Sequence, residues 1–326
     1  MYKKTVAIVG ATGLVGEKLT EIMQSKLTDC DVRLFGNTQA GKRINFRNKR
    51  VTVEKTELLA RADVDYAVFA ATEETAKELI PNLAERGVIC IDNSAYFRLK
   101  KDVPLIVPSV NGDKIGDARI IANPNCSTIQ TVIAVNALKS LQPTKLTAAT
   151  YQSVSGAGKA GLCDLTEKNG YGKLTAFNHP IYDNVIPQIG EICKDGYTAE
   201  ERKMLYESRK ILDMPRLKVN CFCARVPVSA GHGVFVNLAF AEKVNIDEIR
   251  DLLKQAENII LLDSPEGHVY PMPMTMRNTK YVGVGRICKD RTANAVNMFV
   301  VADNLLRGAA YNAYEILECV IRRSNA

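Results

Sequence analysis

Two residues in this chain stand in surroundings suited to covalent catalysis on a carbonyl group. Cys126 lies in the run ANPNCST, at the expected start of a helix, where the positive end of the helix dipole favours a thiolate. Most cysteines are inert core residues, but this polar run with its Asn-Pro turn argues against simple packing. His232 lies in RVPVSAGHG, and its glycine-flanked bend favours it over His179 and His268 as an acid/base. The pair predicts a cysteine nucleophile served by a histidine.

Charged side chains near these residues indicate a substrate that carries anionic groups. Arg225 lies on the same strand and bend as His232, and the fork of a guanidinium matches a carboxylate. The helical run AEERKMLYESRK places Glu200 and Lys203 one turn apart on one face. Surface ion pairs would also explain these residues, so their roles stay open at this point.

A glycine-rich turn near the N-terminus predicts a dinucleotide site. GATGLVG follows the apolar strand expected over 5–9 and opens a helix. Its glycines Gly10, Gly13 and Gly16 let the backbone approach a pyrophosphate, and the helix starting near Thr12 directs its first amides at that anion. A glycine turn without a ligand is the alternative, which the order strand, turn, helix disfavours.

The segment after the second expected strand bears on the kind of nicotinamide cofactor. An acidic residue usually binds the ribose diol of NAD at this place, but the run reads LFGNTQAGKR and contains no carboxylate. Four residues are instead available to an additional phosphate, namely Thr38, Gln39, Lys42 and Arg43. The sequence therefore favours NADP.

The elements that must position these residues fall into two lobes. In the first, short apolar runs alternate with helical stretches, which is the pattern of a parallel sheet with helices on both faces. Strands are expected at 5–9, 32–35, 66–71, 88–91 and 119–122, with a helix at 74–86 between two of them. We predict an α/β fold whose first domain is doubly wound, of the Rossmann type, and binds a dinucleotide.

The second lobe contains longer segments of alternating hydrophobicity. Strands are expected at 144–153, 218–228 and 233–242, helices from 126 to about 139, at 199–212 and at 246–257, and a loop-rich region at 159–196. This pattern predicts an α+β catalytic domain with a mixed or antiparallel sheet. We set the domains at 1–125 and 126–300, with a final helix in 301–326 that packs back on the first domain and completes it.

Composition narrows the classes of partner. The net charge is 43 − 36 = +7 without a dense basic run, which argues against nucleic acid and suits small anions. No apolar stretch approaches membrane-spanning length and MYKKTVAIVG holds no signal-peptide core, so we expect no membrane partner and nine reduced cysteines in a cytoplasmic protein. Cys221 and Cys223 have C-x-C spacing, but their segment alternates like a strand. We therefore expect burial there and no metal site.

Seven motifs along the chain resemble those of the aspartate-semialdehyde dehydrogenase family. In order, they are GATGLVG, DNSAYFR, IANPNCST, YQSVSGAGK, EERKMLYESRKIL, RVPVSAGHG and ADNLLRGAAYNA. The resemblance spans nearly the whole chain. It implies the NADPH-dependent reductive dephosphorylation of L-aspartyl-4-phosphate to L-aspartate 4-semialdehyde and phosphate, in the biosynthesis of lysine, threonine and methionine. It also implies a homodimer formed through the second domain, which would then be both catalytic and a dimerisation domain.

The same resemblance implies catalytic and substrate-binding roles. Cys126 would form a thioester, His232 would act as the acid/base, and Gln152 would orient the thioester. The substrate-binding residues would be Arg225 at the α-carboxylate, Glu200 at the α-ammonium, and Arg98, Lys203 and Asn125 at the leaving phosphate.

Cofactor-binding residues are implied in both domains. They would be Gly10, Thr12, Gly13, Leu14, Val15, Gly16, Thr38, Gln39, Ser155, Gly156 and Asn304. The chain departs from the family pattern in three places. Thr38 and Gln39 replace the usual Arg-Ser at the NADP 2′-phosphate, Ser109 replaces a glutamate in PSVN, and Ala71-Thr72 replaces a glycine pair.

Two alternative functions stay open. The related reductase of N-acetyl-glutamyl phosphate shares the chemistry but acts on an acylated amino group, against which the carboxylate of Glu200 argues. A catalytically inactive relative that senses a dinucleotide or serves as an assembly partner would be free to lose Cys126 or His232, and both are present.

Overall fold

The structure is a computed structural model that describes residues 3–167 and 174–324. The described residues form two compact units, one from 3–124 with 309–324 and the other from 125–308. The chain therefore returns to the first unit at Ala309. The final helix was expected within 301–326, but Val301 and Ala302 complete a strand because both are buried and paired in the second sheet.

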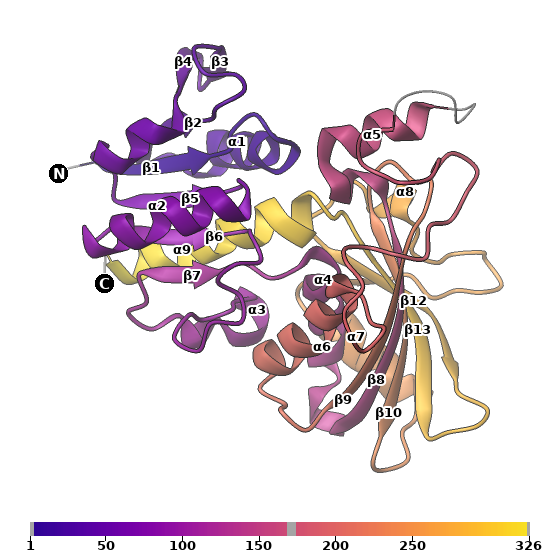
Figure 1. The fold of residues 1–326 in the computed structure, drawn as a ribbon. Coiled ribbons are helices and arrows are strands. Elements are labelled where there is room, and N and C mark those ends of the chain that lie inside the picture. The colour runs from indigo at the N-terminus through magenta and orange to yellow at the C-terminus, as the bar shows by residue number, and fades with distance from the viewer. Residues whose placement is uncertain (1–2, 168–173, 325–326) are drawn as a thin grey trace. The chain divides into compact units, whose positions relative to one another are not determined.

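The first unit is built on a seven-stranded sheet of order β3-β4-β2-β1-β5-β6-β7 (Figure 1). All neighbouring pairs are parallel except β3 with β4. Its elements are β1 (Lys4–Val9), α1 (Leu14–Lys26), β2 (Cys30–Phe35), β3 (Arg43–Phe46), β4 (Lys49–Glu54), η1 (Thr56–Arg61), β5 (Tyr66–Phe69), α2 (Glu73–Glu85), β6 (Ile89–Asp92), α3 (Pro108–Asn111), η2 (Gly112–Ile115), β7 (Ile120–Ala122) and α9 (Tyr311–Ser324).

Strand order and crossover hand place the helices of this unit on both faces of the sheet. The chain moves from β1 to β2 in one direction and from β5 to β6 in the other, so right-handed crossovers put α1 and α2 on opposite faces. Helix α9 packs against α1, β5 and β6. The four residues of β5 are all buried, as is typical of a parallel strand covered on both faces. The predicted doubly wound architecture is confirmed.

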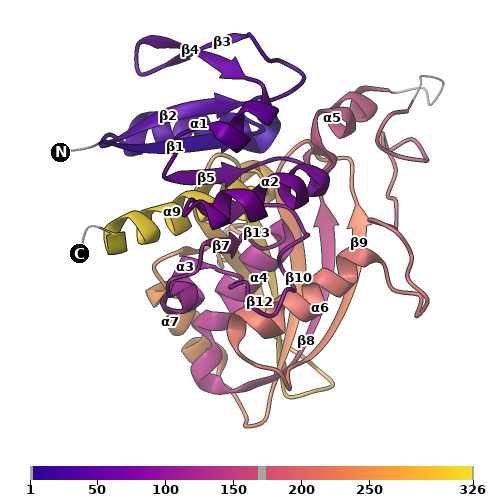
Figure 2. The ribbon, with the colours of Figure 1, turned by 60° about the vertical axis from the view of Figure 1, so that its left-hand side comes forward.

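The second unit contains a mixed six-stranded sheet of order β11-β12-β13-β10-β8-β9 (Figure 2). Pairs β8-β9 and β11-β12 are parallel and the others antiparallel. Its elements are α4 (Cys126–Ala137), η3 (Lys139–Leu141), β8 (Pro143–Gln152), η4 (Val154–Ala157), α5 (Gly158–Thr166), α6 (Ala199–Leu212), β9 (Lys218–Arg225), β10 (His232–Phe240), α7 (Ile246–Gln255), β11 (Ile259–Leu261), α8 (Pro273–Met276), β12 (Val282–Lys289) and β13 (Ala295–Ala302). The π-helical turn η5 (Leu306–Ala310) begins in this unit and ends in the first.

Helices α4, α6 and α7 cover one face of this second sheet, and the opposite face carries a row of apolar residues. Strand register places Phe299, Phe235, Ala149 and Phe222 side by side across β13, β10, β8 and β9. Phe222 is 53% exposed and Tyr151 of β8 is 45% exposed. An apolar row of this kind on a sheet face is typical of a surface that another chain covers.

Several elements differ from the sequence prediction. Strands β12 and β13 were not predicted. In β12 the segment VGVGRICK mixes glycine and charge with its apolar residues. The lack of space around this strand explains its glycines: a Cβ on Gly283 would lie 2.8 Å from Met276 Sδ. Helix α5 falls in the region expected to be loop-rich, and the predicted strand 218–228 ends at Arg225.

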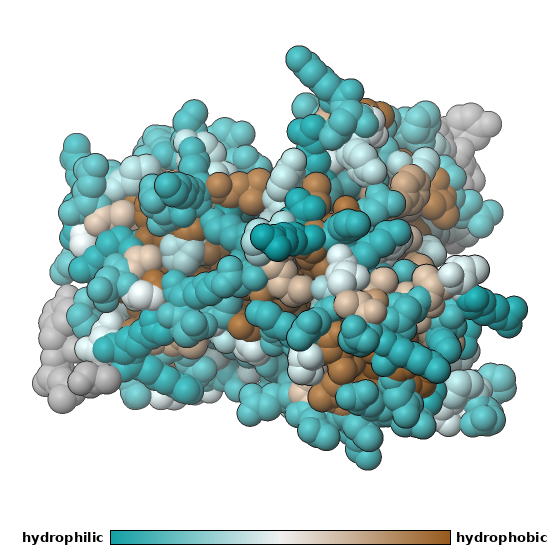
Figure 3. All heavy atoms as spheres, turned by 90° about the horizontal axis from the view of Figure 1, so that it is seen from below, coloured by the Kyte–Doolittle hydropathy of each residue, from teal (hydrophilic) through white to brown (hydrophobic). Residues whose placement is uncertain are grey.

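Surface character agrees with the composition. Seen from below, the molecule is mostly hydrophilic, with separate hydrophobic patches over both units (Figure 3). No helix in the described parts of the chain has the length and apolar character needed to cross a membrane.

Candidate active site

Cys126 is the first residue of α4, as the sequence predicted. Asn125 is the N-cap of this helix, and its Oδ1 accepts from the amides of Ser127 at 3.0 Å and Thr128 at 3.3 Å. The cap fixes the direction in which the helix leaves the loop. Cys126 is partly exposed, whereas its two neighbours in the chain are buried. The thiol thus sits at the positive end of a well-defined helix, where a thiolate is favoured.

Two residues that were not predicted from the sequence hold the cysteine loop from other elements. Glu207 of α6 is 1% exposed, and its Oε2 accepts from the main-chain N–H of Asn125 at 2.7 Å. Gly308 of η5 lies directly against the cysteine, because a Cβ added there would stand 2.9 Å from Cys126 Cβ. Both contacts bridge distant parts of the sequence, so no local pattern pointed to them.

Replacing Gly308 by alanine should shift the start of α4. The added methyl group has to displace either the η5 turn or Cys126, so we expect a loss of about 1–3 kcal/mol in the free energy of unfolding and a marked fall in kcat. Gly112→Ala is the matched control, since its Cβ would meet only Pro108 Cβ at an ordinary 3.8 Å. Chemical denaturation and steady-state rates measure both effects. Equal behaviour of the two variants would show that the contact at Cys126 is not tight.

A buried carboxylate, Glu200, joins several of the predicted residues into one cluster. Its Oε1 accepts from Asn125 Nδ2 at 2.8 Å and from Gln152 Nε2 at 3.2 Å, and its Oε2 lies 3.1 Å from Lys203 Nζ. Burial acts to raise the pKa of Glu200, but the charge of Lys203 and the hydrogen bonds from Asn125 and Gln152 together lower it. The cluster therefore presents an ionised carboxylate beside the cysteine loop.

Arg225 ends β9 and is 6% exposed. Its Nη1 donates to the carbonyl of Ser153 at 2.8 Å, its guanidinium lies 5.8 Å from the centre of the Phe177 ring, and its buried Nε has no hydrogen-bond partner among the described residues. Burial lowers the pKa of Arg225, while the nearby acidic groups of Glu200 and Cys126 raise it. A buried cation with an unsatisfied donor is suited to bind an anionic group of a substrate.

His232 begins β10 and is completely buried. Its Nδ1 lies 3.0 Å from both the amide nitrogen and the Oγ of Ser153, and its Nε2 has no hydrogen-bond partner among the described residues. Burial first, and the charge of Arg225 second, lower the pKa of His232 to about 3, with Glu200 acting in the opposite direction. The imidazole is therefore neutral at any physiological pH.

The neutral state of His232 has a consequence for acid stability. An unfolded chain takes up a proton on this histidine near pH 6.5, whereas the folded chain excludes it down to about pH 3, so folding loses stability as the pH falls between these values. Relative to His232→Asn, we expect the free energy of unfolding to fall by about 1.4 kcal/mol per pH unit below about pH 5.5. Denaturant unfolding at several pH values measures the difference. If the free energies of unfolding of the two proteins changed with pH in parallel, the folded protein would not be keeping His232 unprotonated.

The predicted cofactor residues of the second unit surround the same bend. Asn304 follows β13, and its Oδ1 accepts from the N–H of Gly231 at 2.8 Å and from Ser153 Oγ at 3.1 Å, while its Nδ2 donates to Ser155 Oγ at 3.0 Å. A Cβ on Gly156 would lie 3.5 Å from His232 Nε2 and 2.7 Å from Arg225 Nη1. Asn304 thus has its side chain engaged within the protein, and Gly156 leaves room beside the imidazole.

In the first unit the glycine turn has the geometry that a pyrophosphate needs. Gly10 has φ +79°, and a Cβ there would collide with the carbonyl oxygen of Ala70, while a Cβ on Gly16 would collide with the carbonyl of Gly10. Gly13 is the N-cap of α1 and offers no side chain to the first-turn amides. Those amides belong to Leu14, Val15 and Gly16 and are oriented for an anion.

A pocket of about 420 Å³ lies at the carboxyl edge of the same sheet. It is lined by residues that follow β2 and β4 and by the first half of α2, namely Asn37, Lys55, Thr56, Glu57, Thr75, Glu78 and Leu79. Asn37 Oδ1 accepts from the N–H of Thr56 at 3.2 Å. Thr38 and Gln39 stand in the exposed turn that follows Asn37, and Gln39 accepts from Lys42 Nζ at 3.0 Å. None of the residues that line this pocket was predicted from the sequence.

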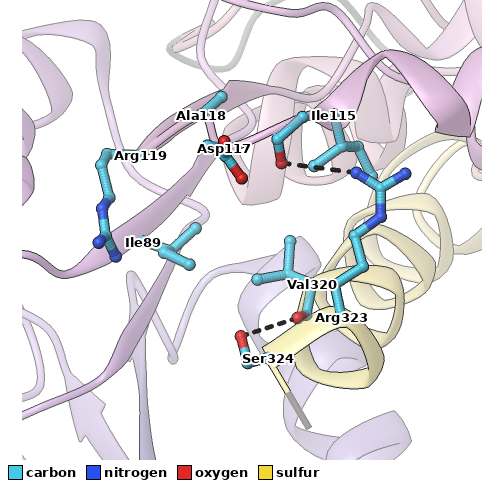
Figure 4. A pocket seen from close by; sticks show the side chains of 9 residues that line it. Ile89, Ile115, Asp117, Ala118, Arg119, Val320, Arg323 and Ser324 are labelled. Atoms are coloured by element: carbon cyan, nitrogen blue, oxygen red, sulfur yellow. Dashed lines mark hydrogen bonds between the residues drawn. The ribbon is translucent and has the colours of Figure 1, made fainter. Parts of the chain in front are cut away.

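A second pocket, of about 230 Å³, lies at the opposite edge of the first sheet, where β6 and β7 begin (Figure 4). Val320 and Arg323 of α9 line it together with Arg119. No residue predicted for catalysis or binding lines this second pocket, so we assign it no part in the chemistry.

Arg98 is the one predicted substrate-binding residue that belongs to the first unit. It is 7% exposed, with Nε donating to the carbonyl of Asn123 at 2.9 Å and Nη2 to that of Asn93 at 2.7 Å. The other predicted catalytic and substrate-binding residues all lie in the second unit.

Cys221 and Cys223 are buried in β9 with their Sγ atoms 3.7 Å apart, and hydrogen bonding to Cys223 and burial raise the pKa of Cys221.

Two family models match the chain along most of its length. The semialdehyde dehydrogenase NAD binding domain matches residues 5–118, and the semialdehyde dehydrogenase dimerisation domain matches residues 136–307. The glycine turn lies within the first match, and His232 and Arg225 lie within the second. The class that the fold and the site define is thus that of the semialdehyde dehydrogenases.

Individual relatives narrow the class. Aspartate-semialdehyde dehydrogenase of Aquifex aeolicus is 39% identical over 97% of this chain and 98% of its own. Aspartate semialdehyde dehydrogenase II of Vibrio cholerae complexed with ASA aligns with a TM-score of 0.93 at 36% identity, over 99% of both chains. The Candida albicans enzyme with NADP, at 23% identity and a TM-score of 0.77, shares the fold. The chain belongs to the aspartate-semialdehyde dehydrogenase family.

Proposed function

We propose that this protein reduces L-aspartyl-4-phosphate to L-aspartate 4-semialdehyde and phosphate through a thioester on Cys126, with NADPH as the reductant. The observation that carries the proposal is the cluster in the second unit. A helix N-terminus presents the Cys126 thiol, and an ionised Glu200, a buried Arg225 and a neutral His232 are held around the same loops. Membership of the family supports the choice of substrate.

The reaction follows from these groups. The Cys126 thiolate attacks the acyl carbon, the bond between that carbon and the phosphate oxygen breaks, and phosphate leaves with the bonding electron pair. Bound NADPH supplies the hydride that reduces the thioester. His232 forms a hydrogen bond with the oxygen of the resulting thiohemiacetal. Rupture of the C–S bond then releases the aldehyde and restores the thiolate.

Substrate recognition is assigned to the charged residues around the thiol. Arg225, whose buried Nε has no hydrogen-bond partner among the described residues, binds the α-carboxylate, and Glu200 binds the α-ammonium. Lys203 and Arg98 bind the leaving phosphate. Asn125 assists at the phosphate while its side chain caps α4. Gln152, which is hydrogen-bonded to Glu200, orients the thioester.

The first unit fits a dinucleotide, and we assign its pyrophosphate to the turn of Gly10, Thr12 and Gly13 with the amides of the first turn of α1. The adenosine end fits the pocket beside Asn37 and Thr75. Thr38 and Gln39, with Lys42 beside them, are assigned to the 2′-phosphate, because this loop contains no carboxylate to bind a ribose diol. Ser155, Gly156 and Asn304 are assigned to the nicotinamide side of the site.

A homodimer is the assembly that the second unit supports. Two copies of the apolar row formed by Phe299, Phe235, Ala149 and Phe222 would cover each other's open sheet face. Phe222→Asp should then yield monomers in light scattering after size-exclusion chromatography, and an unchanged mass would exclude this face.

We further assign the protein to the cytoplasm and to the synthesis of lysine, threonine and methionine.

Phosphate-dependent oxidation of L-aspartate 4-semialdehyde, measured with NADP and NAD in parallel, tests substrate and cofactor together. We expect phosphate-dependent activity with a preference for NADP. N-acetyl-glutamate 5-semialdehyde, assayed alongside, is the substrate of the alternative enzyme. Activity with the acetylated compound alone would overturn the assignment, and activity with NAD alone would overturn the role of Thr38 and Gln39.

A further inference from the structure

The hydrogen bonds of His232 define which of its ring nitrogens carries the proton. A main-chain N–H can only donate, and that of Ser153 points at Nδ1 from 3.0 Å. Nδ1 must therefore offer a lone pair, which places the single proton of the neutral ring on Nε2. Protonation of Nδ1 would set two N–H groups against each other inside a fully buried site.

A network of buried side chains holds both partners of this hydrogen bond. Asn304 Oδ1 accepts from the N–H of Gly231, which precedes the histidine, and from the hydroxyl of Ser153. Gln130 of α4 donates from Nε2 to the carbonyl of His232 at 3.0 Å. Ser153 and His232 are thus clamped to each other through Asn304, at positions far apart in the sequence.

The other side of the ring is arranged to present the Nε2 proton. Nε2 is buried and has no hydrogen-bond partner among the described residues, and the missing side chain of Gly156 leaves space next to it. The charged groups that face the ring are Arg225 of β9 and Glu200 of α6. The guanidinium of Arg225 opposes a second positive charge on the imidazole.

We propose that the main-chain N–H of Ser153, held in place by Asn304, is a positioning group that fixes His232 as a neutral donor with its proton on Nε2. His232 then stabilises the developing oxyanion by donating a hydrogen bond and takes up no proton during turnover. The tautomer stands on the hydrogen bonds alone, whereas its use on an oxyanion rests on the proposed function. This role is narrower than the acid/base role expected from the sequence.

The count of electron pairs and protons in the reduction of the thioester is compatible with this narrower role. Hydride addition to the thioester carbon moves the π electron pair of the carbonyl onto oxygen. When the C–S bond breaks, its electron pair goes to sulfur and the oxygen re-forms the carbonyl. Thioester plus hydride thus gives aldehyde plus thiolate, with no net proton taken or given. A fixed donor near the oxygen is sufficient, and such donors typically contribute about 100- to 1,000-fold to the rate.

Nitrogen NMR of the full-length protein with ¹⁵N-labelled histidine tests the tautomer without any substrate. The chain contains three histidines, so His232→Asn identifies the signals by their loss. We expect the coupling pattern of a neutral ring with the proton on Nε2, unchanged between pH 5 and 8. A ring with its proton on Nδ1, or one that becomes doubly protonated in this range, would overturn the proposal. Neither result would depend on whether the proposed substrate is correct.

Variants of the clamp separate positioning from simple packing. Asn304→Ala removes the acceptor for Gly231 and Ser153, so we expect signals of the second tautomer and a fall in kcat of roughly 10- to 100-fold with little change in the KM for the semialdehyde. Asn304→Asp retains the acceptor oxygens and should restore the single tautomer. Ser153→Ala keeps the main-chain donor and should keep the tautomer as well. If Asn304→Ala left both the tautomer of His232 and kcat unchanged, Asn304 would have no positioning role.

Discussion

Cys126→Ala should lower kcat by at least about 10⁴-fold while leaving NADPH binding intact, because alanine has no thiol on which the thioester could form. The alanine fits the first turn of a helix and leaves the Asn125 cap in place. The loss is therefore chemical and not structural. Steady-state rates, together with NADPH titration by fluorescence and thermal unfolding, separate the two.

Cys288→Ala is the matched control for this experiment, since Cys288 is exposed on β12 and belongs to no part of the site. It should retain parental rates. Substantial turnover by Cys126→Ala would show that another residue is the nucleophile. Labelling with a thiol reagent gives a further check, because an unreactive Cys126 would favour the alternative of an inactive dinucleotide sensor.

Arg225→Lys should reduce kcat/KM for the semialdehyde by about 100-fold. The guanidinium donates to the Ser153 carbonyl from Nη1 and retains further donors for a carboxylate, whereas an ammonium group cannot serve both in the same geometry. The loss of the contact with Ser153 also loosens the loop that holds His232. Both effects act on substrate use, so NADPH affinity should stay close to that of the parent.

Arg202→Lys is the corresponding control, because Arg202 forms an exposed ion pair with Asp195 at 2.9 Å on the same α6 segment as Glu200. Its kinetics should match those of the parent. If Arg225→Lys behaved in the same way as this control, Arg225 would have a structural role only.

The parts of the fold that the sequence predicted are those set by local patterns. The runs of β1, β2, β5, β6 and β7 are short and largely apolar, and their alternation with helical stretches predicted a parallel sheet with helices on both faces. Cys126 was placed at a helix start from its polar neighbours, and the structure confirms that place. Local chemistry was enough in each case.

The parts that were not predicted depend on contacts between distant segments. Glu207 accepts from the main-chain N–H of Asn125, and Gly308 lies against Cys126. The main-chain N–H of Ser153 donates to His232. Ser153 and Gly308 lie within motifs that were recognised, but only the folded chain brings them to their partners. Strand β12 was missed for a related reason, since its glycines are required by neighbours that lie elsewhere in the sequence.

The most direct test of the account is a single-turnover reaction of L-aspartate 4-semialdehyde with NADP in the absence of phosphate. We predict a burst of about one NADPH per active site, followed by arrest with an aspartyl group attached to Cys126, which mass spectrometry of the digested protein locates. Added phosphate should discharge the adduct and restart turnover. A reaction without a burst, or an adduct on any other residue, would contradict the thioester on Cys126.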